Sequence, residues 1–205
     1  MLSRPLRLGF LASRRGSSLR AIVDAIAAGE LEAEARIVIS NNADAEALDF
    51  ARDRGLSWRH VSARTAGSPE AADAAIAAAL RDAGAELVVL SGYLRKLGPQ
   101  VLRAYRGRIL NIHPALLPAY GGHGMYGRRV HEAVHAAGET VTGATVHLVE
   151  AEYDTGPVLA QVEVPLAPGG TVEDVERQVA AAEPTLFVST LRAIADGMLE
   201  LPEHD

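Results

Sequence analysis

The sequence predicts an α/β protein built on one open sheet, because short apolar runs alternate with amphipathic helical segments along most of its 205 residues. Such alternation is typical of βαβ units, in which the strands run parallel. Two alternating runs near the C-terminus have the spacing of an antiparallel pair. We therefore expect a single domain, residues 1–205, with a Rossmann-like open sheet that is mostly parallel, an antiparallel C-terminal strand pair and a long C-terminal helix.

In the N-terminal half, each expected strand is a short apolar run, and each expected helix stops at a glycine, the residue that best adopts the C′ conformation. The expected strands are Leu6–Ala12, Arg36–Ser40, Trp58–Val61 and Glu86–Leu90. The expected helices are Ser17–Ala28 before Gly29, a helix from the turn and N-cap Asn41–Asp44 to Arg54 before Gly55, and Pro69–Ala83 before Gly84.

In the C-terminal half, proline and glycine mark the boundaries. The expected strands are Arg108–His113, which Pro114 stops, then Thr142–Glu150 and Pro157–Pro165, which flank a turn at Ala151–Gly156. The expected helices are Arg128–Ala137, which Gly138 ends, and Val172–Asp196, with Thr171 as N-cap.

Composition excludes several classes of function. The chain has no cysteine, which excludes disulfides, iron–sulfur clusters and thiol nucleophiles. Its net charge of −6 argues against a broad basic face for nucleic acid or a membrane surface. No apolar stretch approaches the roughly 18 residues that span a bilayer, and the N-terminus has no signal-peptide core. We expect a cytoplasmic protein, monomeric or homodimeric.

The loop Ser13–Ser18 follows the first expected strand and opens the first helix. A helix N-terminus at the carboxyl end of a parallel strand offers free N–H groups to a phosphate. Gly16 allows close backbone approach, and Ser17 and Ser18 add hydroxyl donors. The loop matches neither the dinucleotide nor the Walker pattern. An ordinary turn with a serine N-cap explains it equally well.

Asn111 and His113 lie two apart on an expected strand and so share a face, at the carboxyl end where active sites collect. An amide beside an imidazole can stabilise an oxyanion and move a proton. The alternative is a structural histidine. The acidic turn Glu150–Pro157 is either a solvated hairpin or the source of a carboxylate that reaches the histidine and raises its pKa.

A formal zinc motif, His131-Glu132-Ala133-Val134-His135, also lies on an expected helix. Its context argues against a metal, because Val141 stands where a third histidine is needed and Arg128 and Arg129 would oppose a dication. We interpret it as a surface helix with two histidines one turn apart, and expect no metal.

Six segments, in order, resemble the phosphoribosylglycinamide formyltransferase family, the folate-dependent enzymes of purine synthesis. They are Gly16-Ser17-Ser18-Leu19, Ser40-Asn41-Asn42-Ala43-Asp44-Ala45, Leu90–Leu97, Asn111-Ile112-His113-Pro114 with Ala115–Pro118, Gly124-Met125-Tyr126-Gly127 with Val130–Val134, and Asp154-Thr155-Gly156-Pro157. The resemblance covers about residues 6–195. It accounts for the histidine-bearing helix without a metal.

The resemblance implies formyl transfer from 10-formyltetrahydrofolate, a co-substrate, to the amine of glycinamide ribonucleotide, by direct attack through a tetrahedral intermediate. It implies three sets of site residues. The catalytic trio is Asn111, His113 and Asp154; the phosphate and ribose ligands are Gly16, Ser17, Ser18 and Glu183; the folate contacts are Leu94, Arg95, Lys96, Leu97, Val149 and Glu150, together with Asn111 and Asp154.

The sequence departs from the family pattern at four positions. Ser18 stands for the usual Asn, Ala115 for Ser, His123 for Lys, and Pro69 for an Arg that contacts the folate in many members. The last departure puts one side-chain contact to the folate in doubt. Four alternatives share parts of the pattern: methionyl-tRNA formyltransferase, formyltetrahydrofolate hydrolase, a sugar-nucleotide N-formyltransferase and a binding module without chemistry. The missing RNA-binding and regulatory segments argue against the first two, and the intact trio argues against the last.

Overall fold

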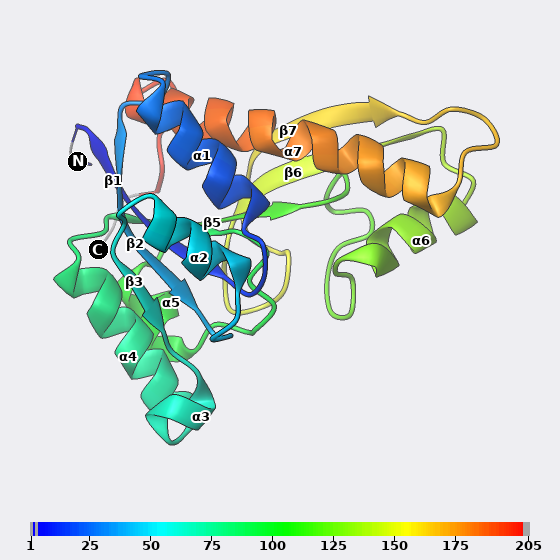
Figure 1. Cartoon of the computed structure of the whole chain (residues 1–205). Helices are drawn as coiled ribbons and strands as arrows, with labels where there is room; N and C mark the ends of the chain where they lie inside the picture. The colour runs from blue at the N-terminus through cyan, green and yellow to red at the C-terminus, as the bar shows by residue number, and fades with distance from the viewer. Residues whose placement is uncertain (1, 3, 203–205) are drawn as a thin grey trace.

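Seven strands form one sheet in the order β3-β2-β1-β4-β5-β6-β7 in the computed structural model, which describes residues 2 and 4–202 (Figure 1). The strands are β1 Leu6–Ala12, β2 Ala33–Ser40, β3 Trp58–His60, β4 Leu87–Leu90, β5 Ile109–His113, β6 Val141–Leu148 and β7 Val158–Pro165. The helices are α1 Ser17–Ala27, α2 Glu46–Asp53, α3 Ala63–Ala66, α4 Pro69–Asp82, α5 Pro99–Ala104, α6 Arg128–Ala136 and α7 Val172–Ala195.

The neighbouring strands β3, β2, β1, β4 and β5 are parallel, and β6 and β7 add an antiparallel pair at one edge. The predicted mixed sheet and long C-terminal helix are therefore confirmed. The prediction of one domain over residues 1–205 remains an expectation, and its ends fall partly outside the described residues. None of the described helices combines the length and apolarity needed to cross a membrane.

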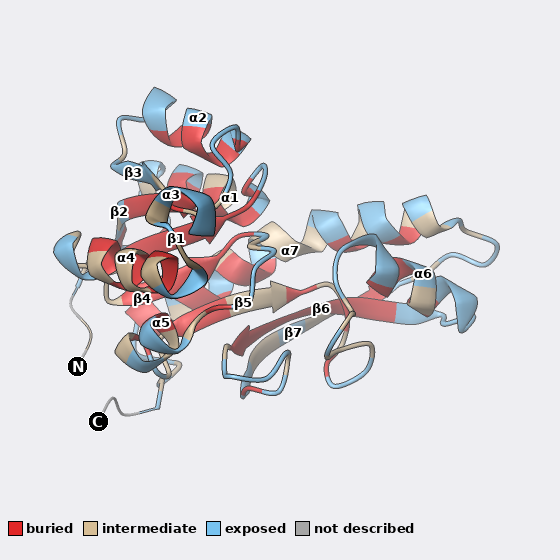
Figure 2. Cartoon of the chain, turned by 90° about the horizontal axis from the view of Figure 1, so that it is seen from below, coloured by how far each residue is buried: buried red, intermediate tan, exposed pale blue. Residues whose placement is uncertain are grey.

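The sheet has a separate hydrophobic core on each face, because successive strand residues point to opposite sides. In β1, Leu8 and Phe10 belong to the core beneath α1, α2 and α7, whereas Leu11 belongs to the core beneath α4 and α5. Figure 2 shows the resulting buried sheet between exposed outer helix faces. A sheet covered on both faces leaves its strand ends as the exposed surface where ligands can reach the backbone.

The carboxyl ends of β1 and β4 meet where the strand order reverses, which is where open α/β sheets bind ligands. The loops that leave these strands are joined by hydrogen bonds. Ser13 donates its hydroxyl to Asn41 Oδ1 (2.6 Å) and accepts one from the N–H of Leu94 (2.8 Å), while Asn42 Nδ2 donates to the Ser13 carbonyl (2.6 Å). Ser13 and the two asparagines thus fix the loops after β1, β2 and β4 relative to one another.

This arrangement corrects one prediction, because the turn Asn41–Asp44 does not cap the following helix. The N-cap of α2 is Ala45, and it makes no side-chain hydrogen bond. Other differences are short. β2 begins at Ala33 rather than Arg36, β6 ends at Leu148 rather than Glu150, and the helices α3 and α5 were not expected.

Candidate functional site

A hollow of about 510 Å³ opens at the carboxyl edge of the sheet, between the loops that follow β1, β4, β5 and β6 and one turn of α7. It brings together all but one of the predicted site residues. They are Ser17, Ser18, Leu94, Arg95, Lys96, Leu97, Asn111, His113, Val149, Glu150, Asp154 and Glu183, with only Gly16 outside the lining. Its volume is in the range of small-molecule sites, about 300–1,000 Å³.

Gly16 is the N-cap of α1 and has a left-handed backbone (φ +67°), which turns the chain sharply into the helix. No side chain caps this helix end, so the serine N-cap alternative is wrong. The N–H of Leu19 bonds to Ser91 Oγ at 2.9 Å. In the described chain the N–H groups of Ser17 and Ser18 have no hydrogen-bond partner. Two free donors at a helix N-terminus make an anion site.

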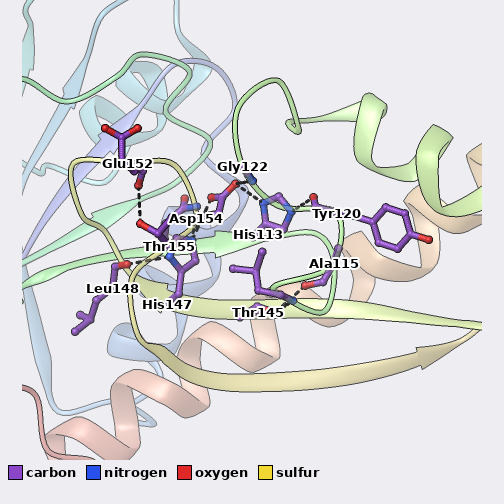
Figure 3. Close-up of polar contacts among 12 residues, drawn as sticks. His113, Ala115, Tyr120, Gly122, Thr145, His147, Leu148, Glu152, Asp154 and Thr155 are labelled. Atoms are coloured by element: carbon purple, nitrogen blue, oxygen red, sulfur yellow. Dashed lines mark hydrogen bonds and ion pairs between the residues drawn. The ribbon is translucent and has the colours of Figure 1, made fainter.

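Asn111 and His113 point from the same face of β5, as their spacing predicts, and the antiparallel partner β6 places His147 opposite Asn111. Asn111 Nδ2 lies 3.1 Å from His147 Nε2. His147 Nδ1 lies 2.9 Å from the carbonyl oxygen of Leu148 (Figure 3). Because Nδ1 donates to that carbonyl, neutral His147 accepts the Asn111 bond at Nε2. The amide of Asn111 keeps a second N–H.

His113 is held between two acceptors. Its Nε2 lies 2.8 Å from the carbonyl oxygen of Tyr120, and its Nδ1 lies 3.5 Å from Asp154 Oδ2 (Figure 3). Burial lowers the pKa of His113, and Asp154 and the Tyr120 carbonyl oppose this by raising it. The expected carboxylate therefore reaches the histidine, but the expected net rise in pKa is wrong because the buried ring loses more hydration than the two acceptors replace.

Asp154 lies between the two histidines. One oxygen, Oδ2, accepts the N–H of Gly122 at 2.9 Å, and the other, Oδ1, lies 3.5 Å from His147 Nε2. Its backbone is left-handed (φ +57°), and so is that of Tyr120 (φ 57°), a conformation that non-glycine residues adopt at a cost. Both residues present an acceptor to His113, so the two strained positions coincide with the two groups that hold its ring.

Thr145 supports the loop that carries the Tyr120 carbonyl. Its hydroxyl donates to the carbonyl of Ala115 at 2.7 Å and accepts from the N–H of Leu117 at 3.0 Å. Gln161 Nε2 bonds both to this hydroxyl (2.8 Å) and to the Leu117 carbonyl (2.9 Å). A buried network in which the groups satisfy one another holds a loop in one conformation.

Glu183 contributes a carboxyl group from the middle of α7. Burial raises its pKa to about 7, and no described side chain makes a hydrogen bond or ion pair with it. The carboxyl group therefore changes charge near neutral pH, beside the free N–H groups at the start of α1.

His147 is the site residue that the sequence analysis missed. Burial also lowers its pKa. A usable signal was present, because a lone histidine interrupts the apolar run of β6. Finding its partner required the register of β5 against β6, which the sequence leaves open.

The two histidines of the zinc-like motif do not converge. His131 is 5% exposed, so its expected place on the surface is wrong. His135 instead contacts the carbonyl of Gly170 through Nε2 at 2.9 Å. Among the described residues, no group of three or more His, Asp or Glu side chains could hold a metal ion.

Comparisons with known proteins agree on one family. The formyl transferase family model matches residues 6–191. A phosphoribosylglycinamide formyltransferase of Mycobacterium tuberculosis is 41% identical over 194 residues, which cover 94% of this chain and 86% of that protein. Glycinamide ribonucleotide transformylase 1 from Symbiobacterium toebii superimposes with a TM-score of 0.89 at 38% identity, covering 97% of this chain and 92% of that structure.

A longer relative contains the same region as one part of its length. The trifunctional purine biosynthetic protein adenosine-3 of Bos taurus is 37% identical over 198 residues, which are 97% of this chain and 19% of the cattle protein. The chain therefore spans about a fifth of that relative and most of the bacterial ones.

Proposed function

The chain belongs to the formyl transferase family, among the phosphoribosylglycinamide formyltransferases, and we propose that it transfers the formyl group of 10-formyltetrahydrofolate to the amine of glycinamide ribonucleotide in purine biosynthesis. One observation carries the proposal. An amide donor, a histidine and a carboxylate converge in a hollow whose rim holds the free N–H groups of a helix start. Asn111, His113 and Asp154 can catalyse acyl transfer, and the start of α1 can bind a phosphate.

In this reaction the amine nitrogen attacks the formyl carbon, a C–N bond forms, and the carbonyl oxygen becomes an oxyanion. Asn111 donates its second amide N–H to that oxyanion, since the first is engaged by His147. Protonated His113 would place its positive charge beside the oxyanion, with Nε2 bound to the Tyr120 carbonyl and Nδ1 facing Asp154. Preorganised donors of this kind need no reorientation as charge develops.

Collapse of the intermediate breaks the bond between the formyl carbon and N10 of the folate. The attacking nitrogen gives up a proton and N10 gains one, so the products are the formylated amide and tetrahydrofolate. Asp154 Oδ2 lies 3.5 Å from His113 Nδ1, and its negative charge favours the imidazolium form of the ring. An arriving negative charge favours the same form, because an opposite charge nearby raises a histidine pKa.

The remaining contacts follow from the lining of the hollow. Ser17 and Ser18 would bind the substrate phosphate through their backbone N–H groups, and Glu183 would accept hydrogen bonds from ribose hydroxyls. The segment Leu94–Leu97 and the residues Val149 and Glu150 would bind the pterin through backbone groups. The hollow therefore offers hydrogen-bonding groups at the phosphate, ribose and pterin positions, which fits the polar groups of these two substrates.

The test is an assay with purified protein, glycinamide ribonucleotide and 10-formyltetrahydrofolate, in which the absorbance of the folate reports loss of its formyl group. Formyl loss that depends on the amine substrate is the expected result. Loss without the amine would identify a hydrolase, and binding of both molecules without loss would identify a binding module. A sugar-nucleotide amine offered in parallel tests the remaining alternative acceptor.

A further inference from the structure

The turn between β6 and β7 carries two neighbouring side chains with opposite surroundings. The carboxylate of Asp154 lies 3.5 Å from His113 Nδ1, and only 11% of its side chain is exposed. The ring of Tyr153 is 42% exposed at the rim of the hollow. Thr155 donates its hydroxyl to the carbonyl of Glu152 at 3.3 Å, which closes the turn around both residues (Figure 3). The position of the buried carboxylate therefore depends on a turn whose outer side chain is an exposed aromatic ring.

The Tyr153 ring contacts side chains from two other loops. Nζ of Lys96, in the loop after β4, lies 5.4 Å from the ring centroid. The imidazole ring of His123, in the loop between β5 and α6, lies 5.9 Å away between centroids and is inclined at 65°, an edge-to-face contact. Both distances fall in the range at which an aromatic ring attracts a cation or another ring. Tyr153 thus joins three loops that line the hollow.

The loop that carries His123 is joined to the turn a second time. Gly122, the residue before His123, donates its N–H to Asp154 Oδ2 at 2.9 Å. Two consecutive residues of one loop therefore contact two consecutive residues of the other. Asp154 also has a left-handed backbone (φ +57°), which a non-glycine residue adopts at a cost. Contacts at Asp154 and at its neighbour Tyr153 oppose relaxation of this costly conformation.

We propose that Tyr153 is a positioning residue whose ring, held by Lys96 and His123, keeps the Asp154 carboxylate against His113. The inference rests on the proposed function, in which that carboxylate assists catalysis through His113. Because residues 153 and 154 are consecutive, a turn that relaxes at the ring also displaces the carboxylate. Contacts of these two kinds each change an equilibrium by about 2- to 12-fold. A displacement of about 1 Å at a catalytic group lowers the rate by as much as about 10²-fold.

The first experiment measures steady-state formyl transfer in three variants. Tyr153→Ala removes both ring contacts, and we expect kcat to fall about fivefold or more, with the KM for 10-formyltetrahydrofolate within about twofold of wild type. Tyr153→Phe keeps the ring and should retain kcat, because the hydroxyl has no hydrogen-bond partner in the described chain. Trp58→Ala is the matched control. Its ring, on β3 and outside the hollow, is 41% exposed and lies 4.8 Å from the guanidinium carbon of Arg52.

A double-mutant cycle separates positioning from direct binding. In an Asp154→Asn background the carboxylate is absent, so adding Tyr153→Ala should lower kcat no further. Equal losses of kcat in both backgrounds would overturn the inference. So would a Tyr153→Ala variant that raises the KM for the folate and keeps kcat, because the ring would then bind the folate itself. A Tyr153→Phe variant as impaired as Tyr153→Ala would also contradict a role for the ring.

Hydrogen exchange of the Gly122 amide, followed by NMR without substrates, tests the same contact independently of turnover. This N–H is bonded to Asp154, so its exchange reports how often the carboxylate leaves its place. We expect exchange about fivefold faster in Tyr153→Ala and unchanged in Trp58→Ala. Unchanged exchange in Tyr153→Ala would overturn the inference and leave formyl transfer intact. Faster exchange in a protein whose wild type fails to transfer formyl groups would support the positioning role and count against the proposed function alone.

Discussion

Replacing Asn111 with alanine tests the oxyanion site most directly. The amide nitrogen of Asn111 lies 3.1 Å from His147 Nε2, which leaves one N–H for the developing oxyanion. Loss of one oxyanion donor typically lowers turnover by about 10²–10³, or about 2.7–4 kcal/mol of transition-state stabilisation. We therefore expect Asn111→Ala to lower kcat by that factor. The KM values for both substrates should change much less, because the donor acts mainly in the transition state.

The same substitution also affects stability, and the two effects can be separated. Without the Asn111 amide, Nε2 of the 2%-exposed His147 loses its donor, which costs about 1–3 kcal/mol. In a chain of this size each kcal/mol lowers the Tm by about 2–4 °C. Ile109→Val on the same strand is the matched control. Ile109 is 1% exposed in the core beneath α4 and α5, and losing one methyl group costs about 0.5–1.5 kcal/mol.

The assay combines steady-state kinetics of formyl transfer with thermal unfolding for wild type and both variants. We expect both variants to unfold at lower temperature and only Asn111→Ala to lose turnover. If Asn111→Ala kept kcat within tenfold of wild type, Asn111 would not be an oxyanion donor. If Ile109→Val lost kcat to the same extent, the loss would reflect destabilisation of the sheet instead.

Three further predictions follow from the ionisable groups. Asp154→Asn should lower kcat by about 10²-fold or more, because His113 loses its carboxylate partner. The Tm should stay near that of wild type, because asparagine tolerates the left-handed backbone at this position. An unchanged kcat would refute the role of Asp154 in catalysis. The KM for glycinamide ribonucleotide should rise about tenfold from pH 8 to pH 6, because Glu183, with a pKa of about 7, becomes neutral over this range. The Glu183→Gln variant should instead show a high KM that does not change with pH. Burial lowers the pKa values of His113, His131 and His147, so the unfolded chain takes up protons first as pH falls below 6.5. The free energy of unfolding should therefore decrease from pH 6.5 to 5.5. Glu183 offsets part of this decrease, because its raised pKa makes the folded chain take up a proton there first. An unchanged urea midpoint would contradict this prediction.

Much of the fold was predictable because local signals agree with the final structure. A glycine with positive φ follows each of the three predicted N-terminal helices, at Gly29, Gly55 and Gly84, as the C′ rule expects. The exceptions depend on contacts between distant residues. Helix α5 has only six residues, and its first N–H groups are bound by Asp73 of α4. No local pattern predicts a cap that comes from another helix.

The candidate site was predictable where strand periodicity governs it. Asn111 and His113 share a face of β5 because side chains alternate along a strand. The pairing of Asn111 with His147 depends instead on the register of two antiparallel strands. Asn41 and Asn42 show a related limit, since their residue types favour a helix cap and the structure uses them to join loops. Residue type indicates which hydrogen bonds a side chain can make, and tertiary packing decides which partner receives them.

The environment of His113 shows why its charge could not be read from the sequence. The nearby carboxylate suggested a raised pKa, yet a buried ring also loses its hydration, and this loss has the larger effect. Protonation still matches the geometry, because both ring nitrogens face acceptors supplied by Tyr120 and Asp154, the two non-glycine residues with positive φ in the described chain. Two costly backbone conformations thus maintain a site that stabilises a cation in a place where burial opposes one. A histidine balanced in this way takes up its proton most readily when negative charge arrives, which is the moment at which the proposed reaction requires it.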